Sequence, residues 1–210
     1  MCKKIIAVFL TLMISLSCIA CTRSFTDRDM DIYEKIHKYY SKMESYSTDL
    51  DMTVFSNKTQ NRYFVSQKVK VPDKFYMRLT DKDGTFSVTT ITNNGITKAL
   101  ADGADYSLSV PSDDYLNMLF VNNFFKAYYA SESTALCVDT SFSESKKTIL
   151  DVFLDDKNLS IKKASLSIDN DELAPDTLTL YGEGDKVLLK ATFSNFKYND
   201  KTNESVFNTD

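Results

Sequence analysis

The sequence predicts an α+β protein in which one antiparallel sheet is combined with a few helices. Most of the chain alternates apolar and polar residues with a period of two, which is typical of strands buried on one face. Two segments instead repeat apolar residues every three to four positions, which is typical of helices. No linker rich in Pro, Gly or Ser interrupts the 210 residues, so we expect a single folded domain.

The first twenty residues predict an export signal and not a part of the fold. Lys3 and Lys4 precede an apolar run over 5–14, and small residues follow it, as in secretory signal peptides. The apolar run is too short for a comfortable membrane-spanning helix. The chain is therefore expected to have three segments, a lipoprotein signal peptide over 1–20, a tether over 21–28 and a folded domain over 29–210.

The end of the signal resembles a bacterial lipobox, the sequence that marks a cysteine for acylation. It reads Cys18-Ile19-Ala20-Cys21, with a small residue directly before the last cysteine. Cys18 stands where Leu is usual, and it is also the rival acceptor. We expect acylation of Cys21, and the alternative is an ordinary signal peptide with an incidental cysteine. Acyl chains on Cys21 would hold the protein at a membrane surface without spanning it.

Removal of the signal changes the inventory of cysteines and charges. Cys2 and Cys18 leave with the signal, and Cys21 carries the lipid. Cys137 alone is left, so no intramolecular disulfide is expected, and its apolar neighbours indicate a buried thiol. Loss of two lysines leaves 23 basic residues against 29 acidic ones, which moves the net charge from −4 to −6. An acidic exported protein is not suited to bind nucleic acid.

The folded domain is predicted to begin with an amphipathic helix of about four turns. Asp27, Asp29 and Asp31 place acidic side chains at its start, where they favour a helix. Its apolar stripe consists of Met30, Tyr33, Ile36, His37, Tyr40 and Met43. The helix is expected to end near 44–47, because period-two alternation follows.

Two runs of antiparallel strands are predicted, one on each side of a second helix. The first run comprises strands over 50–54, 63–71, 75–79, 86–91, 96–101 and 106–110. Asp-Gly at 83–84 and Asn-Gly at 94–95 favour hairpin turns within it. The second run comprises strands over 134–138, 148–154, 159–168, 177–181 and 186–196, with turns at 155–158 and 182–185.

The second helix is predicted over 112–131, between the two runs. Ser112, Asp113 and Asp114 are suited to cap its start. Its apolar side chains cover almost the whole circumference, and they are Leu116, Met118, Leu119, Phe120, Val121, Phe124, Phe125, Ala127, Tyr128 and Tyr129. A helix that is apolar nearly all round is buried on more than one side. We expect it to lie in a concavity of the sheet or beneath a partner.

The sequence shows no grouping that is typical of an enzyme or a metal centre. His37 is the single histidine and lies on the helix stripe. A Ser or Cys nucleophile would have to use this one residue as its general base. Asp81–Gly84 and Asp169–Glu172 favour turns, because neither continues into a calcium loop. No Cys-x-x-Cys pair or phosphate-binding glycine loop occurs. We expect no catalytic residue, metal or cofactor, and an enzyme that uses paired carboxylates is the alternative.

The order of helix, strands, inserted helix and strands is similar to that of the LolA/LolB-type lipoprotein-carrier family. Four stretches carry the resemblance, 39–50, 70–77, 94–106 and 175–196. The second of these begins Lys-Val-Pro-Asp-Lys-Phe, which resembles the crossing from the second to the third strand in that family. The resemblance covers residues 28–207. It implies a curved sheet that forms a half-open barrel, with the inserted apolar helix packed on the concave side.

Within that family, the acylated N-terminus and the Tyr- and Asn-rich composition resemble the clostridial GerS-type spore germination lipoproteins. The resemblance implies a non-enzymatic protein that binds and activates the cortex-modifying N-acetylmuramoyl-L-alanine amidase CwlD. Muramic-δ-lactam is then made in spore cortex peptidoglycan. Only Cys21 is carried over, as the lipid site, and the residues that bind the partner are unknown. The implied location is a membrane surface that faces the spore cortex or the extracytoplasmic space.

Two alternatives for partners and cargo stay open at the level of the sequence. A half-open barrel leaves strand edges, which favour pairing with a partner or strand exchange in a homodimer. The alternative function is a lipid or lipoprotein carrier. Such a carrier needs an apolar concavity that is open to an acyl chain.

Overall fold

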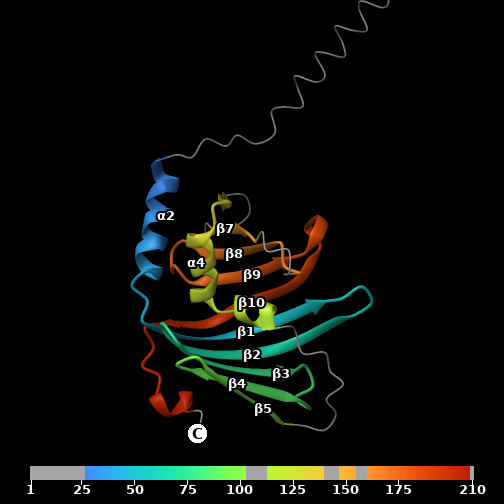
Figure 1. The fold of residues 1–210 in the computed structure, drawn as a ribbon. Coiled ribbons are helices and arrows are strands. Elements are labelled where there is room, and N and C mark those ends of the chain that lie inside the picture. Colours follow the sequence, from blue (N-terminus) through green and yellow to red (C-terminus); the bar gives the residue numbers. More distant parts are fainter. Residues whose placement is uncertain (1–26, 103–112, 140–146, 155–159, 209–210) are drawn as a thin grey trace, which may run out of the picture. The chain divides into compact units, whose positions relative to one another are not determined.

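The computed structural model describes residues 27–102, 113–139, 147–154 and 160–208 (Figure 1). The predicted signal peptide, Cys21 and most of the tether lie outside the described residues. So do the strand predicted over 106–110 and the turn predicted at 155–158. The chain divides into two units, Met1–Asp31 and Ile32–Asp210, and the second contains the whole sheet.

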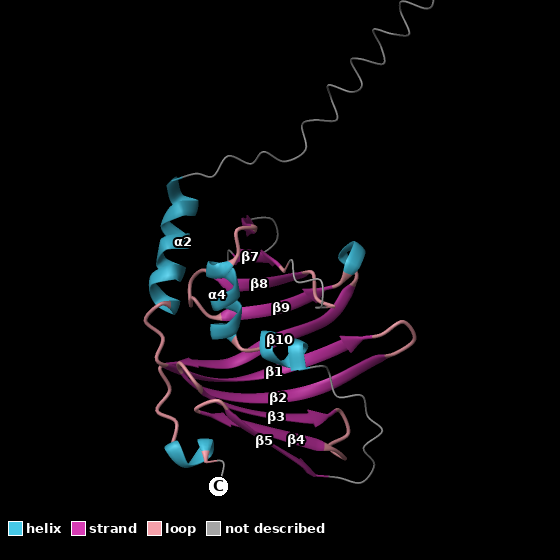
Figure 2. Cartoon of the chain, viewed as in Figure 1, coloured by secondary structure: helices cyan, strands magenta, loops and turns pink. Residues whose placement is uncertain are grey.

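Ten antiparallel strands form the sheet, in two groups that are each continuous in sequence (Figure 2). The first group consists of β1 (Ser45–Phe55), β2 (Gln60–Lys70), β3 (Lys74–Asp81), β4 (Ser87–Asn93) and β5 (Ile96–Asp102). The second group consists of β6 (Thr134–Asp139), β7 (Lys147–Phe153), β8 (Lys163–Asp169), β9 (Pro175–Tyr181) and β10 (Val187–Tyr198). Each group is a meander of sequential neighbours, which confirms the two predicted runs of strands.

The two meanders are joined through β1 and β10. The strand order is β5-β4-β3-β2-β1-β10-β9-β8-β7-β6, so these two strands lie side by side at the centre. Their register places Tyr46 opposite Tyr198 and Met52 opposite Ala191. The edge strands β5 and β6 do not pair with each other among the described residues, so the sheet is open.

One face of the sheet carries the main core. Strand β2 buries Tyr63, Val65, Gln67 and Val69, while the residues that alternate with them are more exposed. Strand β8 shows the same alternation and buries Leu166 and Ile168. Successive side chains of a strand point to opposite faces, so the period of two places all of these on one face. The other face is polar along most of its length.

The first helix, α2 (Asp27–Tyr40), corresponds to the predicted amphipathic helix. Its stripe is only partly buried, because Ile36 and Tyr40 lie in the core while Met30 is 49% exposed. The predicted end near 44–47 is wrong. The N–H groups of residues 42 and 43 bond carbonyls three positions back, which tightens the chain and ends the helix at Tyr40.

The second predicted helix is two helices, α3 (Asp113–Met118) and α4 (Val121–Ala130). The prediction of one continuous helix over 112–131 is wrong, because Phe120 has an extended backbone with φ −79° and ψ 119°. The break has a physical reason. Residues 119–121 are all buried, and consecutive residues of an uninterrupted helix point in different directions.

Helix α4 packs on the core face of the sheet (Figure 1). The ring of Phe125 stacks on Tyr40 of α2 with a centroid separation of 4.2 Å. Just before α4, the ring of Phe120 meets Phe75 of β3 at 5.0 Å. The backbone N–H of Val121 donates to the hydroxyl of Tyr46 at 3.1 Å. The start of α4 is therefore tied to the central strand β1.

Substitution of Tyr46 by Phe is expected to destabilise the fold. Tyr46 is fully buried, and burial raises the pKa of its hydroxyl, so this group stays neutral and accepts from Val121. Its removal leaves a buried N–H without an acceptor, which lowers the free energy of unfolding by about 1–3 kcal/mol. Urea unfolding measures the change. Tyr76→Phe on the opposite face is the control, and equal stability of the two variants would contradict the prediction.

Candidate functional site

The apolar face of the sheet is the site that a lipid carrier would use. In the described residues this face is filled by the chain itself, because Phe124, Phe125 and Tyr128 of α4 are buried against it. A cavity of about 240 Å³ is left, lined by Phe75, Met77, Thr90, Thr92, Thr97, Leu116, Asn117 and Phe120. Ligand pockets usually measure about 300–1,000 Å³. The described cavity is therefore small for an acyl chain.

Strand β5 is an exposed edge of the sheet. Six of its seven residues are exposed, and Ile96 and Leu100 are 65% and 50% exposed. Within the described residues it pairs only with β4, so one row of its backbone N–H and C=O groups has no strand partner. Ile96 and Leu100 lie on the same face, since an even number of positions separates them. Such an edge is a template for pairing with another chain.

The opposite edge is strand β6, where Thr134 and Ala135 are exposed. In the described strands it pairs only with β7, and Cys137 lies opposite Ile149. The side chain of Cys137 lies outside what the structure describes. Burial of its thiol therefore stays a prediction.

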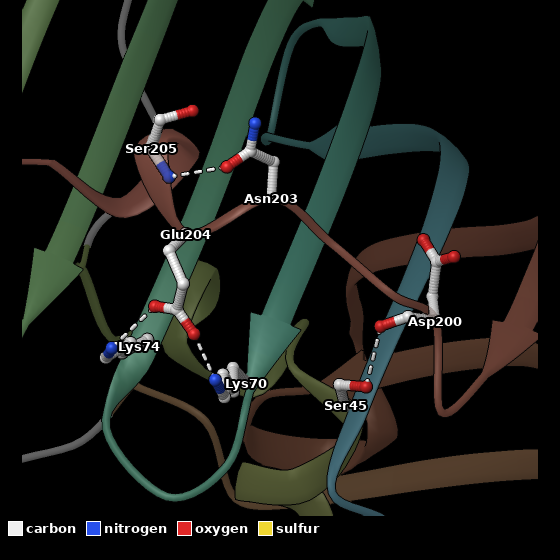
Figure 3. A network of polar contacts seen from close by, with 7 residues as sticks. All are labelled: Ser45, Lys70, Lys74, Asp200, Asn203, Glu204 and Ser205. Atoms are coloured by element: carbon white, nitrogen blue, oxygen red, sulfur yellow. Dashed lines mark hydrogen bonds and ion pairs between the residues drawn. The ribbon is translucent and has the colours of Figure 1, made fainter.

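An ion-pair network holds the C-terminal segment on the face opposite the core (Figure 3). Glu204 begins the short helix η2 (Glu204–Phe207) and pairs with Lys70 and Lys74. The two lysines stand at the end of β2 and the start of β3, and Lys74 Nζ lies 2.7 Å from Glu204 Oε2. One carboxylate thus bridges two adjacent strands.

Further contacts hold the same C-terminal segment. The side chain of Asn203 accepts a backbone N–H at 3.1 Å and caps η2, and the hydroxyl of Ser45 donates to the carbonyl of Asp200 at 2.8 Å (Figure 3). The side-chain amide of Asn93 on β4 donates to the carbonyl of Phe207 at 3.1 Å. The ring of Phe207 is only 1% exposed, although it lies outside the main core cluster. The segment is therefore anchored by an aromatic side chain as well as by charge.

Hydrogen bonds from Lys70 and then Lys74 lower the pKa of Glu204 from 4.5 to about 2. A lowered folded-state pKa stabilises the folded form above the unfolded-state pKa of about 4.5, and this contribution is lost as the pH falls towards 2. The carboxylate is about half exposed, with 54% of its side-chain surface accessible. Exposed ion pairs contribute little to stability, so we assign this network the role of positioning the C-terminal segment.

The two acidic runs form turns, as predicted. The carboxylate of Asp81 accepts from the hydroxyl of Thr85 at 2.7 Å and from the N–H of Phe86 at 2.9 Å, and these bonds lower its pKa. Asp169 accepts two backbone N–H groups, at 2.8 and 3.0 Å. Among the residues that the structure places, no group of three His, Cys, Asp or Glu could hold a metal ion.

His37, the single imidazole, lies on the surface. Its ring meets Tyr129 edge-on with a centroid separation of 4.9 Å and stacks on Tyr33 at 6.4 Å.

The sequence did not indicate the Glu204 network, because 130 or more positions separate Glu204 from both lysines. In the part of the chain with described coordinates, no helix is long and apolar enough to cross a membrane.

A family model described as "Sporulation protein YdcC-like" matches residues 3–207, which is nearly the whole chain. A search of curated protein sequences gives no match.

Solved structures with similar architecture include MucB, with a TM-score of 0.51 at 14% identity over 88% of this chain and 64% of that one. A LolA superfamily protein from Nitrosomonas europaea gives a TM-score of 0.39 at 9% identity, covering 86% and 97% of the two chains. A chain in the complex of the CwlD amidase with the GerS lipoprotein from Clostridioides difficile gives 0.33 at 17% identity, covering 85% and 99%. The likeness to MucB shows a shared fold.

The carboxyl of Glu204 is expected to titrate near pH 2 in the native protein. In the double variant Lys70→Gln/Lys74→Gln its pKa should rise towards 4.5, because the donors that favour the charged form are gone. Carbon-detected NMR of the glutamate carboxyl measures both values. Lys42→Gln, which removes an exposed lysine elsewhere, is the control and should leave the pKa of Glu204 unchanged. An unshifted titration in the double variant would contradict the assigned cause.

Proposed function

This chain belongs to the YdcC-like family of sporulation proteins, and from that premise we propose that it is a lipid-anchored, non-enzymatic binding protein required for spore germination. Its proposed partner is the cortex-modifying amidase CwlD. Binding favours the active form of the amidase by differential contact, so that muramic-δ-lactam is made in spore cortex peptidoglycan. The resemblance of the sequence to GerS-type lipoproteins supports this choice of partner.

One observation carries the choice of a protein partner over a lipid cargo. Helix α4 and the residues just before it fill the apolar face of the sheet, from Phe75 on β3 to Tyr40 on α2. In the described residues, an acyl chain could enter only by displacing side chains such as Phe124, which is fully buried. We also propose that the sheet curves into a half-open barrel with α4 on its concave side, as in the LolA-type family.

The β5 edge is the docking surface that best suits an extended segment of the amidase. Its exposed backbone groups supply main-chain hydrogen bonds, and Ile96 and Leu100 supply apolar contacts on one face. The same edge would serve strand exchange in a homodimer. The binding experiment below separates the two uses, because it records the mass of the complex.

The anchor supports the location in this proposal. An acylated Cys21, followed by a tether over 21–28, would place the folded domain of 29–210 at the outer surface of a membrane. A permanent anchor is less suited to a shuttling carrier. Export and anchoring together would bring the protein to the side on which cortex peptidoglycan is made.

The carrier is kept as a second candidate because the cavity between β3, β4, β5 and α3 is partly apolar. It would require this cavity to widen by movement of α3. Native mass spectrometry of the purified protein decides between the candidates. A co-purified lipid of one defined mass favours the carrier, and a bare protein mass favours the protein partner.

Replacement of the two exposed apolar side chains of β5, Ile96 and Leu100, is expected to weaken amidase binding. The purified protein should form a complex with the amidase and raise its activity, whereas Ile96→Asp/Leu100→Asp should bind at least about tenfold more weakly, because two buried apolar contacts are lost. Light scattering measures the mass of the complex, and amidase assays measure activation. Phe153→Asp on β7, which replaces another exposed apolar residue, is the control.

Three results would contradict this proposal at different levels. Failure of the unaltered protein to bind or activate the amidase would remove the proposed partner. Undiminished binding by Ile96→Asp/Leu100→Asp would remove β5 as the docking edge. A complex of two copies of this chain without amidase would assign the edge to a homodimer.

Acylation is expected at Cys21 alone. When the full chain is produced in bacteria supplied with labelled palmitate, the protein should incorporate the label and sediment with membranes. Cys21→Ser should do neither, because the acceptor thiol is absent. Cys137→Ser is the matched control and should be labelled normally. Label retained by Cys21→Ser would point to Cys18 as the acceptor.

A further inference from the structure

A polar pocket lies on the face of the sheet opposite the core, where β2, β1 and β10 run side by side. It has a volume of about 390 Å³ and is lined by Ser47, Thr48, Asp49, Ser66, Gln67, Lys68, Asn195, Phe196 and Lys197. This volume falls within the range of about 300–1,000 Å³ that is usual for small-molecule sites. No part of the proposed amidase docking edge contributes to it.

A β-bulge shapes the pocket. The register of β1 and β10 shifts between Ser47 and Asp49, opposite Asn195, whose φ is +53°. The hydroxyl of Thr48 donates to the carbonyl of Ser194 at 2.9 Å within the bulge. As a result, the consecutive residues Ser194 and Asn195 are both exposed. Bulges re-aim side chains in this way and recur beside functional sites.

Two lysines flank the floor of the pocket. The register places Ser47 opposite Lys68 on one side and opposite Lys197 on the other, so the three form one row across the strands. With strands about 4.8 Å apart, the two lysine Cα atoms are roughly 10 Å apart. Neither lysine forms an ion pair with a described residue. Lys68 Nζ lies over the ring of Tyr76 on β3, 6.0 Å from its centroid. Both lysines thus flank Ser47 without a carboxylate partner among the described residues, and the ammonium of Lys68 would have to turn from Tyr76 towards a ligand.

The remaining lining groups suit hydroxyl groups of a ligand. In the next row, Ser66 lies opposite Asp49. The side-chain amide of Asn195 donates to Asp49 Oδ2 at 2.9 Å, while the other carboxylate oxygen has no hydrogen bond to a described residue. The hydroxyls of Ser47 and Ser66 have none either. The pocket therefore offers both donors and acceptors, beside its two cations.

We propose that this pocket binds a carboxylate-bearing sugar. The carboxylate would lie between Lys68 and Lys197, where charge-assisted hydrogen bonds are strong. The sugar hydroxyls would bond Asp49, Ser66 and Asn195. A simple inorganic anion uses only the lysine pair, and the volume and the neutral polar lining exceed what it needs. In a chain that is acidic overall, two neighbouring lysines without a described carboxylate partner are a local exception.

The test compares two sugars that differ in one group. N-acetylmuramic acid carries a carboxylate on its lactyl ether, and N-acetylglucosamine lacks it. NMR titration of the full-length protein is expected to shift amides of residues 47–49, 66–68 and 195–197 with N-acetylmuramic acid. N-acetylglucosamine should bind at least about tenfold more weakly, since one charge-assisted bond is worth about a factor of ten. No amidase is present, so the result does not depend on the proposed partner.

Variants locate the binding within the molecule. Lys68→Gln/Lys197→Gln should weaken binding of N-acetylmuramic acid at least about tenfold. Lys190→Gln is the matched control, because it removes an exposed lysine from β10 outside the pocket, and it should bind normally. Ser66→Leu, which fills the floor, should abolish binding while far-UV circular dichroism shows an intact sheet.

Inorganic phosphate and phosphatidylglycerol vesicles form the comparison arms. If either shifts the same amides and N-acetylmuramic acid does not, the pocket binds phosphate groups and the sugar proposal is overturned. Equal binding of the two sugars would overturn the role of the lysine pair. Unchanged binding by Lys68→Gln/Lys197→Gln would place the sugar elsewhere on the protein.

Discussion

The pairing of β1 with β10 is the interaction on which the rest of the structure depends. It joins strands that are about 140 positions apart and makes one sheet of two meanders. It also sends the outermost strands, β5 and β6, to opposite ends. The chain between them includes α3 and α4, and α4 packs on the apolar face of the sheet. Leu119, Phe120 and Val121, at the junction of the two helices, are all buried.

The position of α4 helps to determine which surfaces of the sheet are free. The apolar face is covered by α4 and by the buried residues 119–121 that precede it. The opposite face is partly covered by the C-terminal segment, through Phe207 and the pairing of Glu204 with Lys70 and Lys74. Among the described surfaces, the edges of β5 and β6 and the polar floor over β2, β1 and β10 are left for ligands. These surfaces are formed by backbone geometry as much as by side chains.

The periodicity of the sequence predicted the local elements well. Alternation at Val65 and Val69 and the stripe around Ile36 depend on near neighbours, and each strand run and helix type followed from them. The break at Phe120 could not be predicted, because it depends on which surfaces the helix meets after folding. The pairing of Ser47 with Lys197 spans 150 positions and leaves no local spacing pattern. Contacts of that kind make up the pocket and the Glu204 network.

The position of the pocket links ligand binding to the central pairing. Its lining comes from β1, β2 and β10, so a ligand there contacts both meanders at their junction. A ligand that binds only the folded chain stabilises it by mass action, by about 2.7 kcal/mol at a hundred times its dissociation constant. Since the junction holds both halves of the sheet together, this stabilisation acts on the pairing of β1 with β10. Ligand binding in the pocket should therefore raise the free energy of unfolding of the whole sheet through the pairing of β1 with β10.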